Sequence, residues 1–451
     1  MNSNTKSYQI IQLIKLSIPM LISSLSNTLM NSIDTIMANQ AGTLELAGVA
    51  LGSSLWYPVI LFFTGILMSL TPILSTYYGA KEYKKMPTTL HQGLYISLFS
   101  SIIVIIILNN TLPFLLLFNI DYDIAYIASE YLYFLSFGVP AFFLYYLLKS
   151  LTEGCSHTQP AMFISFIGLL LNIPLNYVFI FGLGSIPAYG GAGCGLSTSI
   201  ILWIMAILLF SYLIFSKKYH HFKLLQHFSK PQKNILKLIL SKGLPVAIGI
   251  FCEVSLFFSA AILIAPLGVV PLAAHQIANN ISSIIFIIPL SIGMAVSIRV
   301  GYYIGTKEIN LAKLSVKSGI YLATSLALIT ALITVFFRQN ILSIYTQDQD
   351  VIAIAMTILL FCAIYQIADA IQVINVFALR GFKDTTPVII ISLISFWLMG
   401  IAGGYILSYT HWITEPLGVF GFWIGFILAL FTAAILFNIR LQQIYKKYQH
   451  Q

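Results

Sequence analysis

Three carboxyl residues, Asp34, Glu253 and Asp369, lie within stretches of sequence that are otherwise almost entirely apolar. Where such a stretch crosses a membrane, a carboxylate near the bilayer centre costs about 2.5 to 3.5 kcal/mol on insertion scales, so each acid needs a partner or a role. Two explanations stay open for each. The acid can be a protonated packing residue held by hydrogen bonds, or it can bind a cation or proton that is exchanged for a solute.

Amides accompany the first acid at helical spacing. Asn27, Asn31 and Asp34 follow an i, i+4, i+7 pattern and therefore share one helix face, which must point into protein or water. Further along, Asn172 and Asn176 stand one turn apart around a proline. A kink stabilised by the two amides and a cation or proton relay both explain this pair.

The other two acids are surrounded by oxygen-bearing side chains. Glu253 has no basic residue within one or two helical turns, so it lacks a local ion-pair partner. Tyr365 and Gln372 lie at or near i−4 and i+4 from Asp369, on its face of the helix, and Gln366 is close in sequence. Phenol, amide and carboxylate oxygens suit a hard monovalent cation or a shared proton, whereas thiols or imidazoles suit transition metals.

Other polar residues in apolar segments carry weaker signals. His275 and Gln276 are explained by packing or by ligation, and Arg299 is expected to reach the cytoplasmic face or to pair with an acid. The four cysteines lie far apart without a Cys-x-x-Cys pair, so neither a zinc site nor a disulfide framework is predicted.

The composition excludes a soluble protein. Apolar and aromatic residues make up 59% of the 451 residues and charged residues only 8%, against roughly a quarter charged in soluble domains. The windows 154–216 and 254–298 contain no Asp, Glu, Lys or Arg, and each is at least twice the roughly 20 residues that cross a bilayer. The net charge of +9 is clustered between apolar segments, so we expect no nucleic-acid partner.

The hydropathy pattern predicts an all-α polytopic membrane protein with twelve transmembrane helices. The Gly- and Pro-rich segment 182–193 is the expected turn within the long uncharged window. The first span follows Lys6 and Lys15 without a small-x-small cleavage site, and we expect it to be retained. The predicted spans are 12–37, 46–78, 91–117, 125–149, 160–182, 193–215, 236–264, 271–304, 314–337, 350–378, 387–409 and 417–440.

The distribution of basic residues predicts the orientation. With both termini in the cytoplasm, 22 of the 23 Lys and Arg residues fall on the cytoplasmic side, and only Arg338 does not. The richest basic segment, 217–242, contains seven lysines and no acid, including Lys223. We interpret it as a cytoplasmic linker that contacts anionic lipid headgroups.

An internal duplication divides the chain into two pseudo-symmetric six-helix bundles. Residues 77–82 match 303–308 at an offset of 226, and Glu153-Gly154 matches Arg380-Gly381 at an offset of 227. The predicted domains are an N-terminal bundle, 1–216, the basic linker, 217–242, and a C-terminal bundle, 243–451. An even number of spans in each half gives parallel repeats around a central cleft. The polar residues that we expect to line this cleft are Asn27, Asn31, Gln276, Gln366 and Gln372.

Several functions are disfavoured by missing motifs. The sequence has no GxxxxGK[ST] phosphate-binding loop and no HExxH or Asp-rich metal cluster, so we predict neither an ATP-driven pump nor an enzyme. Energy for transport would come from an ion gradient, because one charge moving through the membrane field is worth about 2.3 kcal/mol per 100 mV. A receptor or channel is disfavoured by the duplication, which suits two moving lobes.

The sequence resembles the multidrug and toxic compound extrusion (MATE) family, specifically its bacterial NorM-type branch. The resemblance spans the whole chain and is specific as a set, although each motif alone is weak. The residues that carry it are Pro19 and Asp34, Glu153-Gly154 with Thr158-x-Pro160, Asn172-x-Pro174, Ala273-Ala-His-Gln276, Glu253, Asp369, and Arg380-Gly381 with Lys383-Asp384-Thr385.

The resemblance implies a monomeric antiporter of the bacterial cytoplasmic membrane. It would export amphipathic, often cationic drugs and dyes by alternating access, with sodium or protons as the coupling ion and no other cofactor. A cation site is implied at Glu253, Tyr365 and Asp369, and a coupling role for Asp34 with Asn172. Some relatives have a second acid where this chain has Asn176, which leaves sodium or proton use undecided.

The alternative within the same superfamily is a lipid-linked precursor flippase. Such a protein should line its cleft with several basic residues that hold phosphate. The predicted spans carry three acids and at most one candidate arginine, Arg299, which favours cationic cargo.

Overall fold

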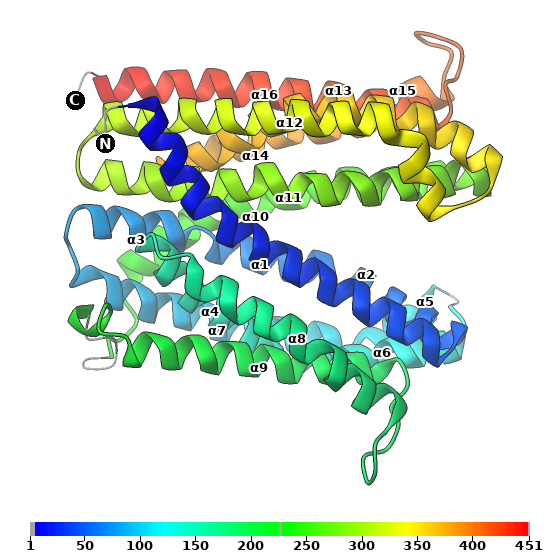
Figure 1. Cartoon of the computed structure of the whole chain (residues 1–451), viewed down its shortest axis with the longest axis horizontal. Helices are drawn as coiled ribbons and strands as arrows, with labels where there is room; N and C mark the ends of the chain where they lie inside the picture. The colour runs from blue at the N-terminus through cyan, green and yellow to red at the C-terminus, as the bar shows by residue number, and fades with distance from the viewer. Residues whose placement is uncertain (1–4, 119, 223, 225–227, 450–451) are drawn as a thin grey trace. The chain divides into compact units, whose positions relative to one another are not determined.

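The computed structural model describes residues 5–118, 120–222, 224 and 228–449 (Figure 1). These residues form helices without a β-strand. The elements are α1 (Lys6–Ala41), α2 (Thr43–Leu67), α3 (Leu70–Gly79), α4 (Lys85–Asn109), α5 (Thr111–Leu117), α6 (Tyr122–Ser136), α7 (Val139–Gly154), α8 (Gln159–Phe181), α9 (Ala192–Phe215), the 3-10 turn η1 (His220–Phe222), α10 (Lys233–Ile264), the 3-10 turn η2 (Ala265–Leu267), α11 (Val269–Gly305), α12 (Ile309–Tyr345), α13 (Gln349–Gly381), α14 (Thr386–Ser392), the π-helical segment η3 (Leu393–Ala402), α15 (Gly403–Tyr409) and α16 (Val419–Gln449).

The predicted membrane spans are confirmed. In the described part of the chain, eleven helical stretches are long and apolar enough to cross a membrane, and the bent pair α6 and α7 makes a twelfth. This pair is bent by 49° just before Pro140, whose ring cannot continue a regular helix. The turn expected at 182–193 connects α8 to α9, and Gly182 adopts a φ of 80° that favours glycine.

The helices form two compact units. The N-terminal unit is Ile18–Gly243, and the C-terminal unit comprises the residues up to Ser17 together with Leu244–Gln451. The chain therefore passes from one unit to the other inside α1 and inside α10. The first passage falls between Ser17 and Ile18, just ahead of Pro19, and the second falls between Gly243 and Leu244, just ahead of Pro245. The two passages therefore correspond at the 226-residue offset of the duplication.

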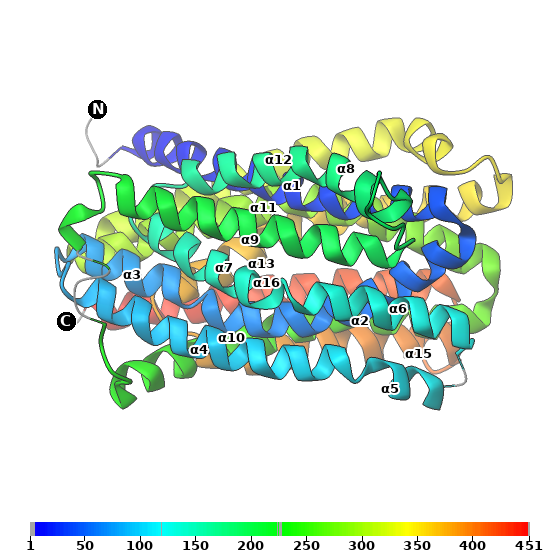
Figure 2. The same ribbon diagram turned by 90° about the horizontal axis from the view of Figure 1, so that it is seen from below.

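The N-terminal unit is built from α2 to α9 and most of α1. Within it, α6 packs against α2 and α9, and α9 also packs against α7 and α8. The neighbouring course of α2 and α6 can be followed in Figure 2. Asp121 starts α6, because its side chain accepts the backbone N–H groups of Asp123 and Ile124 at 3.0 and 3.4 Å.

The C-terminal unit is centred on α13, which packs against α11, α12 and α16 (Figure 1). Asp348 caps α13 as Asp121 caps α6, accepting the N–H groups of Asp350 and Val351 at 2.9 and 3.4 Å. Trp423 of α16 and Phe396 of the π-helical segment are fully buried in this unit. The four free cysteines are buried, two in each unit, as expected for small packing residues.

The duplication extends to the backbone conformation of the helix ends. Lys81 and Lys307 adopt positive φ angles of 58° and 64° just after α3 and α11. Ser156 and Lys383 do the same after α7 and α13, with φ angles of 62° and 59°. In all four turns the N–H group of the next residue donates to the carbonyl five residues earlier, at 2.9 Å. These are Schellman ends in which a non-glycine residue takes the position usually held by glycine.

The described part of the basic segment 217–242 belongs to the N-terminal unit and is held by side chains of α4. His91 Nε2 lies 2.9 Å from the carbonyl of Leu224, and Gln92 Oε1 accepts the N–H of Gln232 at 2.7 Å. Tyr95 donates to the Ser229 carbonyl at 3.2 Å. Lys223, counted in the basic segment from the sequence, lies outside the described residues.

Candidate functional site

The N-terminal unit contains a buried cluster around Asp34. Asp34 of α1 is 6% exposed, and its Oδ1 accepts hydrogen bonds from Asn172 Nδ2 at 2.9 Å and Asn176 Nδ2 at 2.6 Å. Both amides come from α8, where their spacing of four residues puts them on one helix face. The structure therefore brings together the acid and the amide pair that the sequence singled out separately.

The second carboxylate oxygen of Asp34 has a partner that the sequence did not reveal. Thr198 of α9 donates from Oγ1 to Asp34 Oδ2 at 3.3 Å, and Cys194 Sγ contacts the Asp34 carbonyl at 3.6 Å. The three donors offset part of the cost of burying this carboxylate. The Oδ1 atoms of Asn172 and Asn176 are buried without a hydrogen-bond partner among the described residues, so acceptor capacity remains beside the acid.

The C-terminal unit contains a pair of carboxylates joined by one amide. Gln372 Nε2 of α13 donates to Glu253 Oε1 at 3.0 Å and to Asp369 Oδ1 at 3.3 Å. Glu253 comes from α10, whereas Asp369 and Gln372 lie three residues apart on α13. Asp369 is 8% exposed and Gln372 1% exposed. Gln372 thus presents its amide nitrogen to the acids, whereas the sequence pattern predicted an amide oxygen among the ligands.

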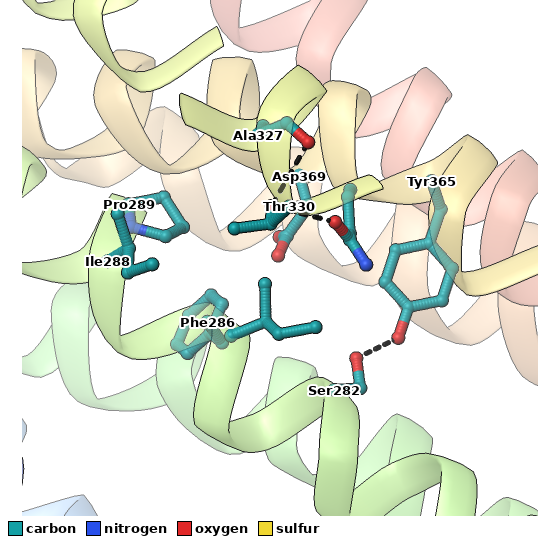
Figure 3. Close-up of a pocket in the computed structure, with 10 residues that line it drawn as sticks. Ser282, Phe286, Ile288, Pro289, Ala327, Thr330, Tyr365 and Asp369 are labelled. Atoms are coloured by element: carbon teal, nitrogen blue, oxygen red, sulfur yellow. Dashed lines mark hydrogen bonds between the residues drawn. The ribbon is translucent and has the colours of Figure 1, made fainter. Parts of the chain in front are cut away.

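A small cavity adjoins Asp369 (Figure 3). Its volume is about 10 Å³, roughly the space of one water-sized particle. Tyr365 lies on its wall and is hydrogen-bonded through its hydroxyl to Ser282 of α11. Figure 3 shows Phe286 and Pro289 on the opposite side of the cavity. The cavity thus combines apolar walls with carboxylate, phenol and hydroxyl oxygens.

A second amide lies in the wall of the same cavity. Gln366 Oε1 accepts a hydrogen bond from Thr330 Oγ1 at 3.0 Å, and its Nε2 lies 3.5 Å from Thr334 Oγ1. Both threonines belong to α12, so α11, α12 and α13 all contribute to this region. Together, Glu253 and the cavity-lining residues offer only oxygen ligands, which suit a proton or a hard cation.

The predicted cleft residues occupy different environments. Gln366 and Gln372 belong to the carboxylate region just described, whereas Gln276 of α11 is exposed. On α1, Asn27 is half-buried and Asn31 is exposed. His275 is fully buried, with its ring 5.5 Å from that of Trp423, so packing explains it better than ligation.

The expectation for Arg299 was wrong. Its side chain is 9% exposed and donates to Gln9 Oε1 at 3.1 Å and to the Tyr303 hydroxyl. The guanidinium also lies 4.6 Å from the Tyr303 ring centre. Among the described residues, Arg299 therefore pairs with no acid, and its buried guanidinium instead finds a neutral acceptor in Gln9 at the start of α1, within the C-terminal unit.

The functional side chains that sequence reasoning missed are mostly hydroxyls. Thr198, Ser282 and Thr330 each hydrogen-bond to a predicted site residue. Serine and threonine are common in transmembrane helices, and the sequence signal for these three was only that they share spans with polar neighbours.

Twelve apolar spans in two repeated halves, with a cluster of carboxylates and amides in each unit, are typical of a polytopic membrane transporter. The family model described as MatE matches residues 19–178 and 245–406, which is well over half of the chain. The chain belongs to the MatE family, and the predicted family is confirmed. Membership in a transporter family also agrees with the expectation that the chain is not an enzyme.

Curated relatives match over nearly the whole chain. The multidrug resistance protein NorM of Vibrio cholerae is 44% identical over 436 residues, covering 96% of this chain and 95% of the relative. NorM of Aliivibrio fischeri is 42% identical over 433 residues, covering 96% and 94%. These matches support the NorM-type branch.

Solved structures share the fold. The crystal structure of the eukaryotic MATE transporter AtDTX14 has a TM-score of 0.88 at 19% identity and covers 99% of both chains. A multidrug resistance MATE family transporter in an outward-facing conformation has a TM-score of 0.89 at 20% identity, covering 98% of this chain and 97% of that one. The fold of twelve helices in two halves is therefore confirmed.

Proposed function

We propose that the protein is a secondary active multidrug exporter. It would expel amphipathic, often cationic compounds in exchange for an inward-moving cation, by alternating access of its two halves. The observation that carries this proposal is the pair of acids, half-buried Glu253 and buried Asp369, joined by Gln372 beside a cavity. The names of the relatives, multidrug resistance proteins, support the substrate class.

Chemically, the two acids provide a site that can hold a cation in exchange for a cationic solute. Two negatively charged carboxylates without a bound cation carry a high free-energy cost in a low-dielectric interior. Binding of a cation lowers this cost and is therefore favourable. Asp34 provides a second candidate coupling site with a different surrounding of three donors. Sodium and protons both suit these oxygen ligands.

We further propose that the protein works as a monomer in a bacterial cytoplasmic membrane, with both termini in the cytoplasm. The orientation is supported by the 22 of 23 basic residues on that side. Lysines of the segment 217–242 would contact anionic lipid headgroups. Small drugs and dyes are the expected partners, and nucleic acid is not.

The test uses the full chain purified into proteoliposomes. Glu253→Gln and Asp369→Asn should each abolish gradient-driven dye transport while leaving the protein folded, as judged by unchanged size-exclusion behaviour. The isosteric replacements keep volume and remove only the negative charge. Undiminished transport by both variants would overturn the proposed cation site.

A further inference from the structure

A half-buried acid outside the two clusters holds the start of α9. Glu45 lies in the first turn of α2, and its Oε2 accepts the backbone N–H of Gly191, the residue just before α9, at 2.6 Å. The first N–H groups of a helix have no partner within the helix, and the helix dipole favours a negative charge beside them. The Glu45 carboxylate therefore ties the start of α9 to α2.

The backbone before α9 is shaped around this carboxylate. Gly190 adopts a φ of 58°, and a Cβ atom there would lie only 2.7 Å from Glu45 Oε1. A Cβ atom at Gly191 would lie 2.9 Å from Glu45 Oε2 and 2.8 Å from the side chain of Val49. These distances are too short for real side chains, so two consecutive glycines leave the space that the carboxylate fills. The contact is thus part of the packing between α2 and α9.

The same face of α9 reaches Asp34. Cys194 and Thr198 follow Gly191 by three and seven residues, so all three residues lie on one face of the helix. Cys194 Sγ lies 3.6 Å from the Asp34 carbonyl, and Thr198 Oγ1 donates to Asp34 Oδ2 at 3.3 Å. The end of α1 and the start of α2 therefore contact one stripe of α9 at three points within two helical turns.

The hydrogen bond from Thr198 is the one that depends on the position of α9. Asn172 and Asn176 donate to Asp34 Oδ1 from α8, at 2.9 and 2.6 Å. Thr198 donates to Oδ2 at 3.3 Å, longer than the about 2.7 to 2.8 Å usual for O–H···O bonds. A small displacement of α9 would break this long bond. Because Gly191 is only two turns away on the same helix, a shift of the start of α9 moves Thr198 as well.

We propose that Glu45 is a positioning residue for Asp34, because it holds the start of α9 and so keeps Thr198 within hydrogen-bonding distance of the Asp34 carboxylate. This inference rests on the proposed coupling role of Asp34. Without the Glu45 contact, the Asp34 anion loses a donor and holds its cation or proton more tightly. The half-saturating concentration of the coupling ion then falls, and the maximal rate falls because the ion is released more slowly.

A purely structural role for Glu45 makes a different prediction. Loss of an acid at a helix start lowers stability, but it leaves the ion dependence of transport unchanged. Asp121 provides a matched control in the same unit, because its carboxylate accepts the N–H groups of Asp123 and Ile124 at the start of α6 at 3.0 and 3.4 Å. Asp121→Ala should lower stability without changing the half-saturating ion concentration.

The experiment uses the full chain in proteoliposomes and follows ethidium transport over a range of sodium concentrations and of pH. Glu45→Ala removes the acceptor of the Gly191 N–H, and the half-saturating concentration of the coupling ion should fall about tenfold, as is typical when a group that orients a ligand is lost. Glu45→Gln keeps an oxygen that can accept this N–H, so its shift should be much smaller than that of Glu45→Ala.

Two further variants test the route through α9. Thr198→Val keeps the shape of the side chain and removes the donor, so it should cause the same shift, and Glu45→Ala should add nothing to it in the double variant. Gly191→Ala leaves Glu45 intact, and its right-handed helical backbone accepts alanine. The added Cβ would push the start of α9 away from Val49 and Glu45, so Gly191→Ala should reproduce the shift.

Each contrary result has a distinct meaning. An unchanged ion dependence in Glu45→Ala, or additive shifts in the double variant with Thr198→Val, would overturn the role of Glu45 while the proposed function stands. If Glu45→Ala does not fold, an unchanged ion dependence in Gly191→Ala would overturn it. If neither folds, Glu45 serves only the fold, and the proposal is overturned. Wild-type ion coupling in Asp34→Asn would instead remove the coupling role on which the inference rests, whatever the result for Glu45.

Discussion

Replacement of Gln372 by methionine tests how the empty cation site is held. Gln372 donates to Glu253 at 3.0 Å and to Asp369 at 3.3 Å. These hydrogen bonds stabilise the two carboxylates when no cation is bound. Methionine has a similar volume and no donor, so Gln372→Met removes both bonds with little change in packing.

The size of the expected effect follows from the charge of the two carboxylates that accept hydrogen bonds from Gln372. A hydrogen bond to a charged group contributes about 1.5 to 3 kcal/mol, and about 1.4 kcal/mol corresponds to a tenfold change in an equilibrium constant. Loss of one such bond destabilises the empty site and favours the cation-bound site. We therefore expect the half-saturating concentration of the coupling ion to fall about tenfold or more. The maximal rate should fall as well, because cation release becomes slower.

The assay is dye transport by proteoliposomes over a range of sodium concentrations and of pH. Asn375 of α13 provides a matched control, because it is a fully buried amide whose Nδ2 lies 3.5 Å from the Ala434 carbonyl. Asn375→Leu can lower stability, but it should leave the ion dependence unchanged. A higher half-saturating concentration in Gln372→Met would refute the reasoning, because it would place the amide among the groups that stabilise the bound cation.

Three other predictions concern coupling and stability. Asp34→Asn removes the negative charge that accepts hydrogen bonds from three donors. Dye efflux should then lose its dependence on the ion gradient while the protein stays folded. Efflux that still depends on the gradient would contradict a coupling role for Asp34. Lys307→Gly removes the steric strain of a side chain at a φ of 64° and should raise the free energy of unfolding by about 1 kcal/mol. The control Lys317→Gly, within α12, should lower the free energy of unfolding by about as much. Thermal melting would show shifts in opposite directions for the two variants. Burial and the charge of Lys218 lower the pKa of His157 from 6.5 in the folded protein. As the pH falls below about 6.5, the unfolded chain therefore binds a proton at His157 more readily than the folded protein does, and the free energy of unfolding decreases. His157→Gln should therefore flatten the acid side of the stability profile, and an unchanged slope would contradict this assignment.

The sequence predicted the parts of the fold that depend on solvent and periodicity. The spans could be located because lipid-facing and core-facing helix residues are both apolar, and charges mark the breaks. The duplication was visible in short motifs, and the structure shows that it includes helix caps at Asp121 and Asp348 and the non-glycine turns at Lys81 and Lys307.

The partners within the site depend on how helices are rotated against one another, which a single sequence does not specify. Asp34 and the amides of α8 are far apart in sequence, and only packing brings them to 2.6 and 2.9 Å. Thr198 could not be distinguished from the other hydroxyls of its span. The helical spacing placed Asn31 and Asp34 on one face of α1, but only Asp34 is buried. The polar face of α1 is broader than the strip of this helix that packs against α8 and α9.

The most direct test of gradient-driven export is to measure efflux of a fluorescent cation from proteoliposomes that contain the wild-type protein. One set of vesicles carries an imposed sodium gradient, another carries an imposed pH gradient, and a third carries neither. We predict that at least one gradient drives the dye against its own concentration gradient and that Asp369→Asn abolishes this effect. Equal dye movement in all three sets would contradict cation-coupled export.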